Sequence, residues 1–496
     1  MPTPSTPPAD LLACPRCDKT PLEPGAVGHR CAACRVDFPA VGGIPWLFAE
    51  PAAALADWRG RAHAADERLR HESAMLDAEL AGDSLGTAAR ARLLRYRGLV
   101  ERQRGALAAL LQPLGAEPRS ARHESYLALR TRLPTDQGLN TYYANVHRDW
   151  AWGGEENAAS LAAISTVLDA TGFDPNGFDP NGFGPNGFDP NGFGPNGFDP
   201  NGLGPNGLGP NGLGHVAVLG AGAGRLAYDC HRAFPTTSLT VLDFNPLLAL
   251  VAAKMFAGET LAMVEFPLAP LGEEDDAVLR ELSAPAPAGD GLYVVLGDAL
   301  RAPFAAGRFD TVLTPWLIDI VDDTLPAFAA RVNRLLKPGG RWVNFGSLAF
   351  AGPARAGRHT PREVAGILTE NGFAEPVSHD TTMPYMCSPA SRHGRRETVF
   401  TFAARKSGDA RDPGRHRALP DWLVTGKGPV PLSPGIRTQV LSTQIHAFVM
   451  GLIDGRRSIH DMARLLEERH LMTSEEAVPA IRNFFIRMVE DARKGV

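Results

Sequence analysis

Four cysteines near the start of the chain have the residue type and spacing of a metal site. Cys14 and Cys17 form one Cys-x-x-Cys pair, and Cys31 and Cys34 form a second. Two such pairs supply four thiolates, enough to close a tetrahedral zinc site. A catalytic zinc keeps one coordination position open, so four thiolates favour a structural zinc. Close pairing of this kind also favours a reducing compartment over a disulfide framework.

A second group of residues has the pattern of a ligand-binding turn. Residues 215–219 are a short apolar run typical of a buried strand, and Gly220, Gly222 and Gly224 follow directly. Residues 225–234 then have a helical pattern. Strand, glycine turn and helix in this order let the backbone approach a bound cofactor closely. The glycines alone are a weak signal, because they serve NAD or FAD equally well.

Two acids at strand ends strengthen the prediction of a cofactor site. Residues 239–243 form a strand pattern that ends in Asp243, at a spacing where a carboxylate can accept both ribose hydroxyls, and Asn245 then begins a helix. Residues 292–298 form a further strand that ends in Asp298. Each acid has a structural alternative: Asp243 could cap the following helix, and Asp298 could close a turn. Because both occur in order, we expect cofactor contacts.

The next elements favour one cofactor. Residues 309–314 are a fourth strand pattern, and a Leu-Lys-Pro-Gly-Gly turn at 336–340 leads into a fifth. This series resembles class I methyltransferases more than dehydrogenases. The resemblance implies an α/β fold with a Rossmann-like sheet, S-adenosylmethionine as cofactor, and an Asp298 side chain that faces the adenine amino group.

Four stretches narrow the resemblance. They are Arg-Asp-Trp at 148–150 with Gly-Gly-Glu-Glu-Asn at 153–157, the glycine loop continued by Arg-Leu-Ala at 225–227, Leu-Ile-Asp at 317–319, and Val-Asn-Phe-Gly-Ser-Leu at 343–348. Together they resemble the carnosine N-methyltransferase-like family, which methylates an imidazole nitrogen of a histidine-containing dipeptide. The resemblance covers roughly residues 141–406 without the repeat described below. It implies that Arg148, Arg225 and the glycine loop hold the cofactor.

The same resemblance implies two residues near the acceptor. Asp319 would contact the substrate imidazole, and Tyr385 is a plausible pocket residue. A carboxylate that accepts one ring N–H fixes the tautomer and stabilises the imidazolium that forms. The alternative is that Asp319 caps a helix beginning near Asp322 and Asp323. The family's histidine after the fifth strand is missing, since residues 348–351 read Leu-Ala-Phe-Ala and His359 is offset. Carnosine itself is therefore in doubt.

The chain divides into four segments. We expect a zinc ribbon at 1–50, a helical connector at 51–133, a methyltransferase domain at 134–406 and a C-terminal module at 415–496. A Gly/Pro/Asn-rich pentapeptide repeat occupies 172–214 within the domain, and its composition favours a flexible loop over an ordered turn spiral. The ribbon resembles the activator subunit of tRNA and protein methyltransferases. The last module resembles PqqD-like winged helices, which hold leader peptides.

Composition limits the partners. Formal net charge is −5 with 44% hydrophobic residues, so no global basic field favours nucleic acid. No apolar run approaches the ~20 residues of a membrane helix, and we expect a cytoplasmic protein with a small-molecule or peptide substrate. Three functions stay open: an N-methyltransferase acting on an imidazole, a methyltransferase whose peptide substrate is held by the C-terminal module, and a non-catalytic scaffold that binds cofactor or a partner methyltransferase.

Overall fold

The computed structural model describes residues 6–82, 85–115, 139, 142–170, 212–350, 355–415 and 428–493. The predicted repeat at 172–214 lies almost entirely outside these residues. Contacts divide the chain into two units, Met1–Ala418 and Leu419–Val496. Among the described residues, no helix is long and apolar enough to cross a membrane.

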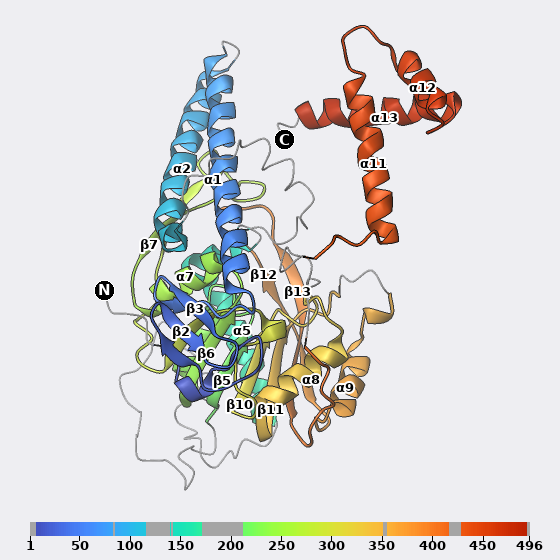
Figure 1. Cartoon of the computed structure of the whole chain (residues 1–496). Helices are drawn as coiled ribbons and strands as arrows, with labels where there is room; N and C mark the ends of the chain where they lie inside the picture. Colours follow the sequence, from blue (N-terminus) through green and yellow to red (C-terminus); the bar gives the residue numbers. More distant parts are fainter. Residues whose placement is uncertain are drawn as a thin grey trace. The chain divides into compact units, whose positions relative to one another are not determined.

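A seven-stranded sheet forms the centre of the first unit (Figure 1). Its strand order is β12-β13-β11-β10-β5-β6-β9, and all neighbours pair in parallel except β13, which runs antiparallel to both β11 and β12. This is the strand arrangement of a class I methyltransferase sheet, as expected from the sequence. The strands are β5 (Gly214–Leu219), β6 (Thr236–Asp243), β9 (Leu292–Leu296), β10 (Phe309–Pro315), β11 (Leu336–Gly346), β12 (Val377–Tyr385) and β13 (Arg395–Arg405).

The sheet is buried on both faces because side chains alternate along each strand. Along β5, Val216 and Val218 join one hydrophobic core, whereas Ala217 and Leu219 join another. The first core packs against α5 (Gly154–Ala170), α6 (Arg225–Ala233) and α7 (Pro246–Phe256), and the second against α8 (Leu325–Leu335) and α9 (Pro361–Glu370). Burial on both faces explains why the parallel strands are near-continuous apolar runs.

The predicted Leu-Lys-Pro-Gly-Gly turn is part of β11 rather than a separate element. The strand begins at Leu336, directly after α8, and its pairing with β10 shifts between Phe309 and Thr311. Gly339 lies at this irregularity with φ +75°, a conformation that favours glycine. The turn therefore begins the strand, and β11 continues regularly from Arg341 onward.

The N-terminal segment is a small antiparallel sheet that packs on the large one. Its strands β1 (Glu23–Gly25), β2 (Gly28–Cys31), β3 (Val36–Val41) and β4 (Ile44–Pro45) pair in chain order. Trp46 forms a parallel bridge with Leu296 of the outermost strand β9, and the Leu47 N–H donates to the Leu296 carbonyl at 2.7 Å. A side chain at Gly297 would meet the Leu47 carbonyl oxygen at 2.9 Å, so glycine permits this approach.

Two long helices follow this segment. They pack against each other as a pair in Figure 1, joined by contacts such as Ser73 to Glu101 at 2.6 Å and Arg104 to Asp66 at 2.9 Å. The hairpin of β7 and β8 contacts them through the Val264 N–H, which donates to Gln103 at 2.8 Å. The elements are α1 (Pro51–Ala81), α2 (Thr87–Leu111), β7 (Leu261–Glu265) and β8 (Val278–Leu282). The connector is thus helical where it is described.

The second unit holds three helices, α11 (Pro434–Gly451), α12 (Ile459–Glu468) and α13 (Ser474–Arg493). They share a small core of Val449, Met462, Ala463, Leu466, Ala477 and Ile481. Between residues 428 and 493 the structure shows no strand. The predicted winged-helix module therefore stays a prediction.

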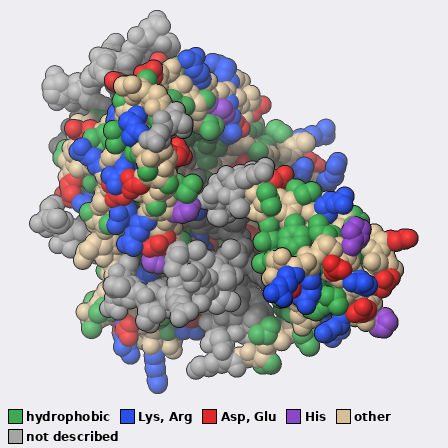
Figure 2. Space-filling model, turned by 90° about the horizontal axis from the view of Figure 1, so that it is seen from above, with side chains coloured by type: hydrophobic (Ala, Val, Ile, Leu, Met, Phe, Trp, Pro, Cys, Tyr) green, Lys and Arg blue, Asp and Glu red, His purple; other side chains and the backbone are tan. Residues whose placement is uncertain are grey.

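The distribution of charged side chains on the surface bears on whether nucleic acid could bind there. On the face in Figure 2, basic and acidic side chains are interspersed rather than gathered by sign. A basic stripe of the kind that tracks a phosphate backbone is not seen on this face.

Candidate functional site

A cavity of about 290 Å³ lies where the carboxyl ends of β5, β6, β10 and β11 meet the end of β12. Open α/β sheets place their ligands at this edge. Six of the predicted site residues line it: Arg148, Gly220, Gly222, Asp243, Asp319 and Tyr385. The cavity joins residues predicted to hold a cofactor with those predicted to hold an acceptor.

The glycine loop forms one part of the wall. Gly220 has φ +68°, and a side chain there would meet Leu317 Cδ1 at 2.8 Å. Gly222 has φ +59° with open space where a side chain would stand. Both residues adopt a left-handed backbone that disfavours other residues. The loop therefore exposes backbone to the cavity, as a cofactor cradle requires.

Asp243 holds the glycine loop in place. Its Oδ2 accepts from the Gly222 N–H at 2.8 Å, and its Oδ1 accepts from the Asn245 N–H at 2.8 Å. Burial raises the pKa of this carboxyl to about 6, although the hydrogen bonds from Asn245 and Gly222 lower it. The helix-cap alternative is wrong, because Asn245 is the N-cap of α7 and accepts from the Leu247 N–H at 3.0 Å.

Four predicted cofactor residues do not line the cavity. Gly224 begins α6, where a side chain would meet Phe256 at 2.7 Å. Arg225 pairs with Asp229 at 2.9 Å and donates to the Asp149 carbonyl at 3.0 Å. The remaining two are the helix cap Asn245 and Asp298.

Asp298 has the alternative role that the sequence left open. It caps the short 3-10 turn η6 (Ala299–Arg301), and its Oδ1 accepts from the Leu300 N–H at 2.8 Å. Its contact with an adenine ring stays a prediction.

A buried charge cluster forms the opposite wall. Arg148, on the turn η4 (Arg148–Trp152), pairs with Asp149 at 2.7 Å and with Glu156 of α5 at 3.1 Å. The other Glu156 oxygen accepts from the Met386 N–H at 2.9 Å. Burial raises the pKa of Glu156, and Arg148 opposes this rise. The cluster thus connects α5 to the end of β12, where Tyr385 lies.

Asp319 follows β10 and is 8% exposed. Its Oδ2 accepts from the Ala349 N–H at 3.1 Å. Burial raises the pKa of this carboxyl, while hydrogen bonds that include Ala349 and the Ser347 side chain lower it. The helix-cap alternative is wrong here too: α8 begins at Leu325, and its cap is Thr324, which accepts from the Ala327 N–H.

Two aromatic rings, those of Trp316 and Tyr385, line the same cavity as Asp319. The Tyr385 ring lies 4.6 Å from the Trp316 ring, centroid to centroid, and the Arg395 guanidinium lies 4.5 Å from the Tyr385 centroid. Arg395 also pairs with Glu397 at 2.8 Å, and both line the cavity.

Several lining residues were missed from the sequence. Trp316, Glu397 and Tyr142 carried no motif that marked them as site residues, and Glu156, although it belongs to the Gly-Gly-Glu-Glu-Asn stretch at 153–157, was given no role in the site. Arg395 belongs to a basic run at 392–396, a composition that is typical of solvated surface. Pairing of Tyr385 with Arg395 across the β12–β13 hairpin brings it to the cavity.

The four cysteines also come together. The Sγ atoms of Cys14, Cys17, Cys31 and Cys34 all lie within 4.8 Å of one another, and Cys14 and Cys31 are buried. This set fits a tetrahedral thiolate site. It belongs to the N-terminal sheet and shares no residue with the large cavity.

Comparison with known proteins indicates a methyltransferase domain in the part of the chain that forms the cavity. Residues 218–343 match the family model of a methyltransferase domain. The chain carries a methyltransferase domain. It is also 30% identical over 125 residues to the ubiquinone/menaquinone biosynthesis C-methyltransferase of Desulfotalea psychrophila. That stretch covers 25% of this chain and 38% of the relative, so the chain spans well under half the relative's length.

Two solved structures are similar at low identity. Phosphoethanolamine N-methyltransferase 2 of Haemonchus contortus, bound to phosphomonomethylethanolamine and S-adenosylhomocysteine, is 14% identical with a TM-score of 0.28 and covers 40% of this chain and 50% of its own. A possible histamine N-methyltransferase of Thermotoga maritima is 15% identical with a TM-score of 0.28. The match covers 57% of this chain and 97% of the Thermotoga chain.

Proposed function

We propose that the protein is an S-adenosylmethionine-dependent N-methyltransferase that methylates an imidazole nitrogen of a small histidine-containing molecule or peptide. One observation carries the proposal: a single cavity is lined both by Asp243 with the glycine loop and by Asp319 with Tyr385. The methyltransferase-domain match supports methyl transfer. The imidazole acceptor rests on Asp319, on its aromatic surroundings and on the sequence resemblance.

The cofactor end fits S-adenosylmethionine. The backbone at Gly220 and Gly222 would lie along the cofactor, and the Asp243 carboxylate would accept from the ribose hydroxyls. The N–H groups of Gly222 and Asn245 already bond to Asp243, and Phe244 adds a further backbone hydrogen bond. A carboxylate has about four lone-pair sites, so acceptor capacity is left for the ribose. When bound, the cofactor supplies an electrophilic methyl group on a sulfonium.

Asp319 would orient the acceptor. A carboxylate that accepts the N–H of one ring nitrogen leaves the lone pair of the other nitrogen free for in-line attack. The same charge stabilises the imidazolium that develops as the methyl group arrives. The Trp316 and Tyr385 rings would hold a flat acceptor and exclude water, which strengthens this electrostatic effect.

The test is a methyl-transfer screen with tritiated cofactor. Histidine dipeptides, histidine, histamine and short histidine peptides form one set, and matched amines and phenols without imidazole form the other. We expect label on the imidazole set, located on a ring nitrogen by NMR. Transfer only to the second set would overturn the acceptor assignment but keep the methyltransferase; no transfer with any acceptor would count against both.

We also propose that the four cysteines hold one structural zinc. All four ligands come from the protein, so no position is open for chemistry. Protein purified without chelator should contain one zinc per chain, and Cys31→Ser should lose it together with protection of residues 6–48 in hydrogen exchange. Wild-type protein free of zinc would refute the proposal.

A further inference from the structure

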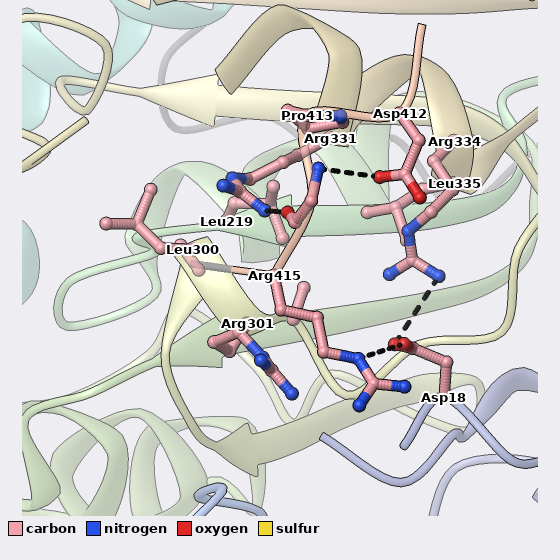
Figure 3. A pocket seen from close by; sticks show the side chains of 13 residues that line it. Asp18, Leu219, Leu300, Arg301, Arg331, Arg334, Leu335, Asp412, Pro413 and Arg415 are labelled. Atoms are coloured by element: carbon pink, nitrogen blue, oxygen red, sulfur yellow. Dashed lines mark hydrogen bonds and ion pairs between the residues drawn. The ribbon is translucent and has the colours of Figure 1, made fainter. Parts of the chain in front are cut away.

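A second cavity, of about 180 Å³, lies apart from the first and shares no lining residue with it (Figure 3). Five segments of the first unit form it. Asp18 comes from the N-terminal segment, Leu219 ends β5, residues 299–302 follow β9, Arg331 and Arg334 come from α8, and residues 412–415 follow β13. We call it the arginine cavity.

Positive charge dominates the lining. Four arginines, Arg301, Arg331, Arg334 and Arg415, face two aspartates, Asp18 and Asp412. Figure 3 shows the guanidinium groups of Arg334 and Arg415 both turned toward Asp18. One carboxylate between two guanidinium groups can neutralise only one of them.

The arginines differ in how well they are paired. Arg331 has good partners, with Asp323 at 2.9 Å and the Gly414 carbonyl at 2.9 Å. Asp18 lies 3.9 Å from an Arg334 nitrogen and 3.4 Å from an Arg415 nitrogen, both longer than a good hydrogen bond. Arg334 and Arg415 are 36% and 55% exposed, so an ion from solvent can reach them.

Arg301 brings a fourth guanidinium group to the cavity. It donates to the Pro15 carbonyl, so it connects the cavity to the N-terminal segment. Burial lowers its pKa, and Arg415 and Arg331 lower it further, whereas Asp18 and Asp298 raise it. Arg331 and Arg415 therefore lie close enough to Arg301 to repel it, and the two aspartates lie close enough to attract it.

We propose that the arginine cavity binds a dianionic phosphate group, either inorganic phosphate or the phosphate of a small monoester. Planar guanidinium groups match phosphate oxygens in bidentate geometry and are weakly hydrated. The volume equals roughly six water molecules at ~30 Å³ each, which is room for one phosphate. The bound ion would give Arg334 and Arg415 a second anionic partner beside Asp18 and would join the segments that line the cavity.

The opposing explanation is that these ion pairs only join the segments of the fold to one another and bind no ligand. The two explanations differ in wild type, which binds phosphate only if the cavity is a binding site. Asp18 competes with a bound anion for Arg334 and Arg415, so Asp18→Asn should strengthen a binding that wild type already shows. In a plain set of ion pairs, wild type binds no phosphate, and any affinity of Asp18→Asn comes only from the two arginines that lose their shared carboxylate. Asn tolerates the left-handed backbone at this position, where φ is +62°.

The experiment titrates the full chain with sodium phosphate by calorimetry at low ionic strength, with chloride at equal ionic strength as the blank. We expect saturable binding, a several-fold lower Kd in Asp18→Asn, and a Kd at least about tenfold higher in Arg415→Gln. Glycerol 3-phosphate in a parallel titration separates the two sources, since the source that binds more tightly is the physiological class. The melting temperature should rise with phosphate in wild type and Asp18→Asn.

Arg97→Gln is the matched control, because Arg97 is similarly exposed at 40% and pairs with Asp77 far from the cavity in the sequence. It should bind phosphate like wild type. Because Asp18 follows Cys17, the zinc content of Asp18→Asn must equal that of wild type for its titration to count. No saturable binding in wild type, or the same Kd in Arg415→Gln and wild type, would overturn the proposal.

Discussion

The cofactor end and the acceptor end of the large cavity are built in different ways. At the cofactor end, the glycine loop and Asp243 lie at the carboxyl ends of two successive strands, β5 and β6, and backbone N–H groups fix the geometry. At the acceptor end, Glu156, Asp319 and Tyr385 come from three distant parts of the chain. Side-chain contacts such as Glu156 to Met386, separated by 230 positions, hold them together.

This difference separates the residues expected to bind the cofactor from the residues expected to select the acceptor. A local strand–turn–helix unit can cradle one cofactor wherever it occurs. An acceptor pocket made from remote segments can change without disturbing that unit. Substitutions at the cofactor end should therefore change cofactor affinity alone, and substitutions at the acceptor end should change turnover or acceptor KM alone.

The largest effect is expected at Asp319. Asp319→Asn keeps the shape and can still accept from Ala349, but it cannot stabilise an imidazolium. Turnover should fall by about 10²–10⁴, the range of a positioned acid or base. Affinity for S-adenosylmethionine should stay unchanged in calorimetry. Asp380→Asn, the same change on an exposed strand position, should be silent in both assays. Near-normal turnover in Asp319→Asn would remove Asp319 from the acceptor site.

The next effect is expected at Asp243. Asp243→Ala removes a charged acceptor for the ribose and releases Gly222, so cofactor binding should weaken by roughly 1.5–3 kcal/mol, or about 10- to 150-fold. Calorimetry with S-adenosylhomocysteine measures this directly. The acceptor KM at saturating cofactor should move little. An equal loss at both ends would show that they are coupled.

The pH dependence of cofactor binding gives a third test. Burial raises the pKa of Asp243 to about 6, and ribose hydroxyls bond best to the ionised form. Affinity should be constant above pH 7 and fall about tenfold by pH 5. Without the shift, affinity would hold to about pH 4. The neutral variant Asp243→Asn should show a flat profile, and a flat profile in wild type would contradict the assignment.

The raised pKa of Asp243 affects folding stability in the opposite direction from cofactor affinity. A carboxyl whose folded pKa lies above its unfolded value of 3.8 contributes stability at low pH, and this contribution is lost as the pH rises through about 6. Weaker cofactor binding near pH 5 is thus not a sign that unfolding has begun at Asp243.

The smallest effect is expected at Tyr385. Tyr385→Leu removes the ring that packs on Trp316, and such aromatic pairs contribute roughly 0.5–1.5 kcal/mol, so the acceptor KM should rise about 2- to 12-fold. Tyr385→Phe keeps the ring and should behave like wild type. If Phe and Leu are equally impaired, the hydroxyl rather than the ring contacts the acceptor.

The same contrast explains what the sequence could predict. Four strands expected from apolar runs match β5, β6, β9 and β10 closely, because parallel strands buried on both faces keep an apolar pattern. Asp243 and the glycines were found because their signal is local. Glu156 and Arg395 were missed because their place in the cavity depends on contacts between distant strands and helices. Asp319 was found only through the family resemblance.

The bridge from Trp46 and Leu47 to Leu296 bears on how the outer edge of the large sheet is protected from other chains. β9 is the outermost strand of the large sheet, and an uncovered outer strand offers free N–H and C=O groups to any other chain. The N-terminal sheet occupies part of that rim. It precedes β9 in the chain, so it is synthesised before that strand. Chains that lack residues 1–50 should therefore aggregate through β9 even where the large cavity is intact.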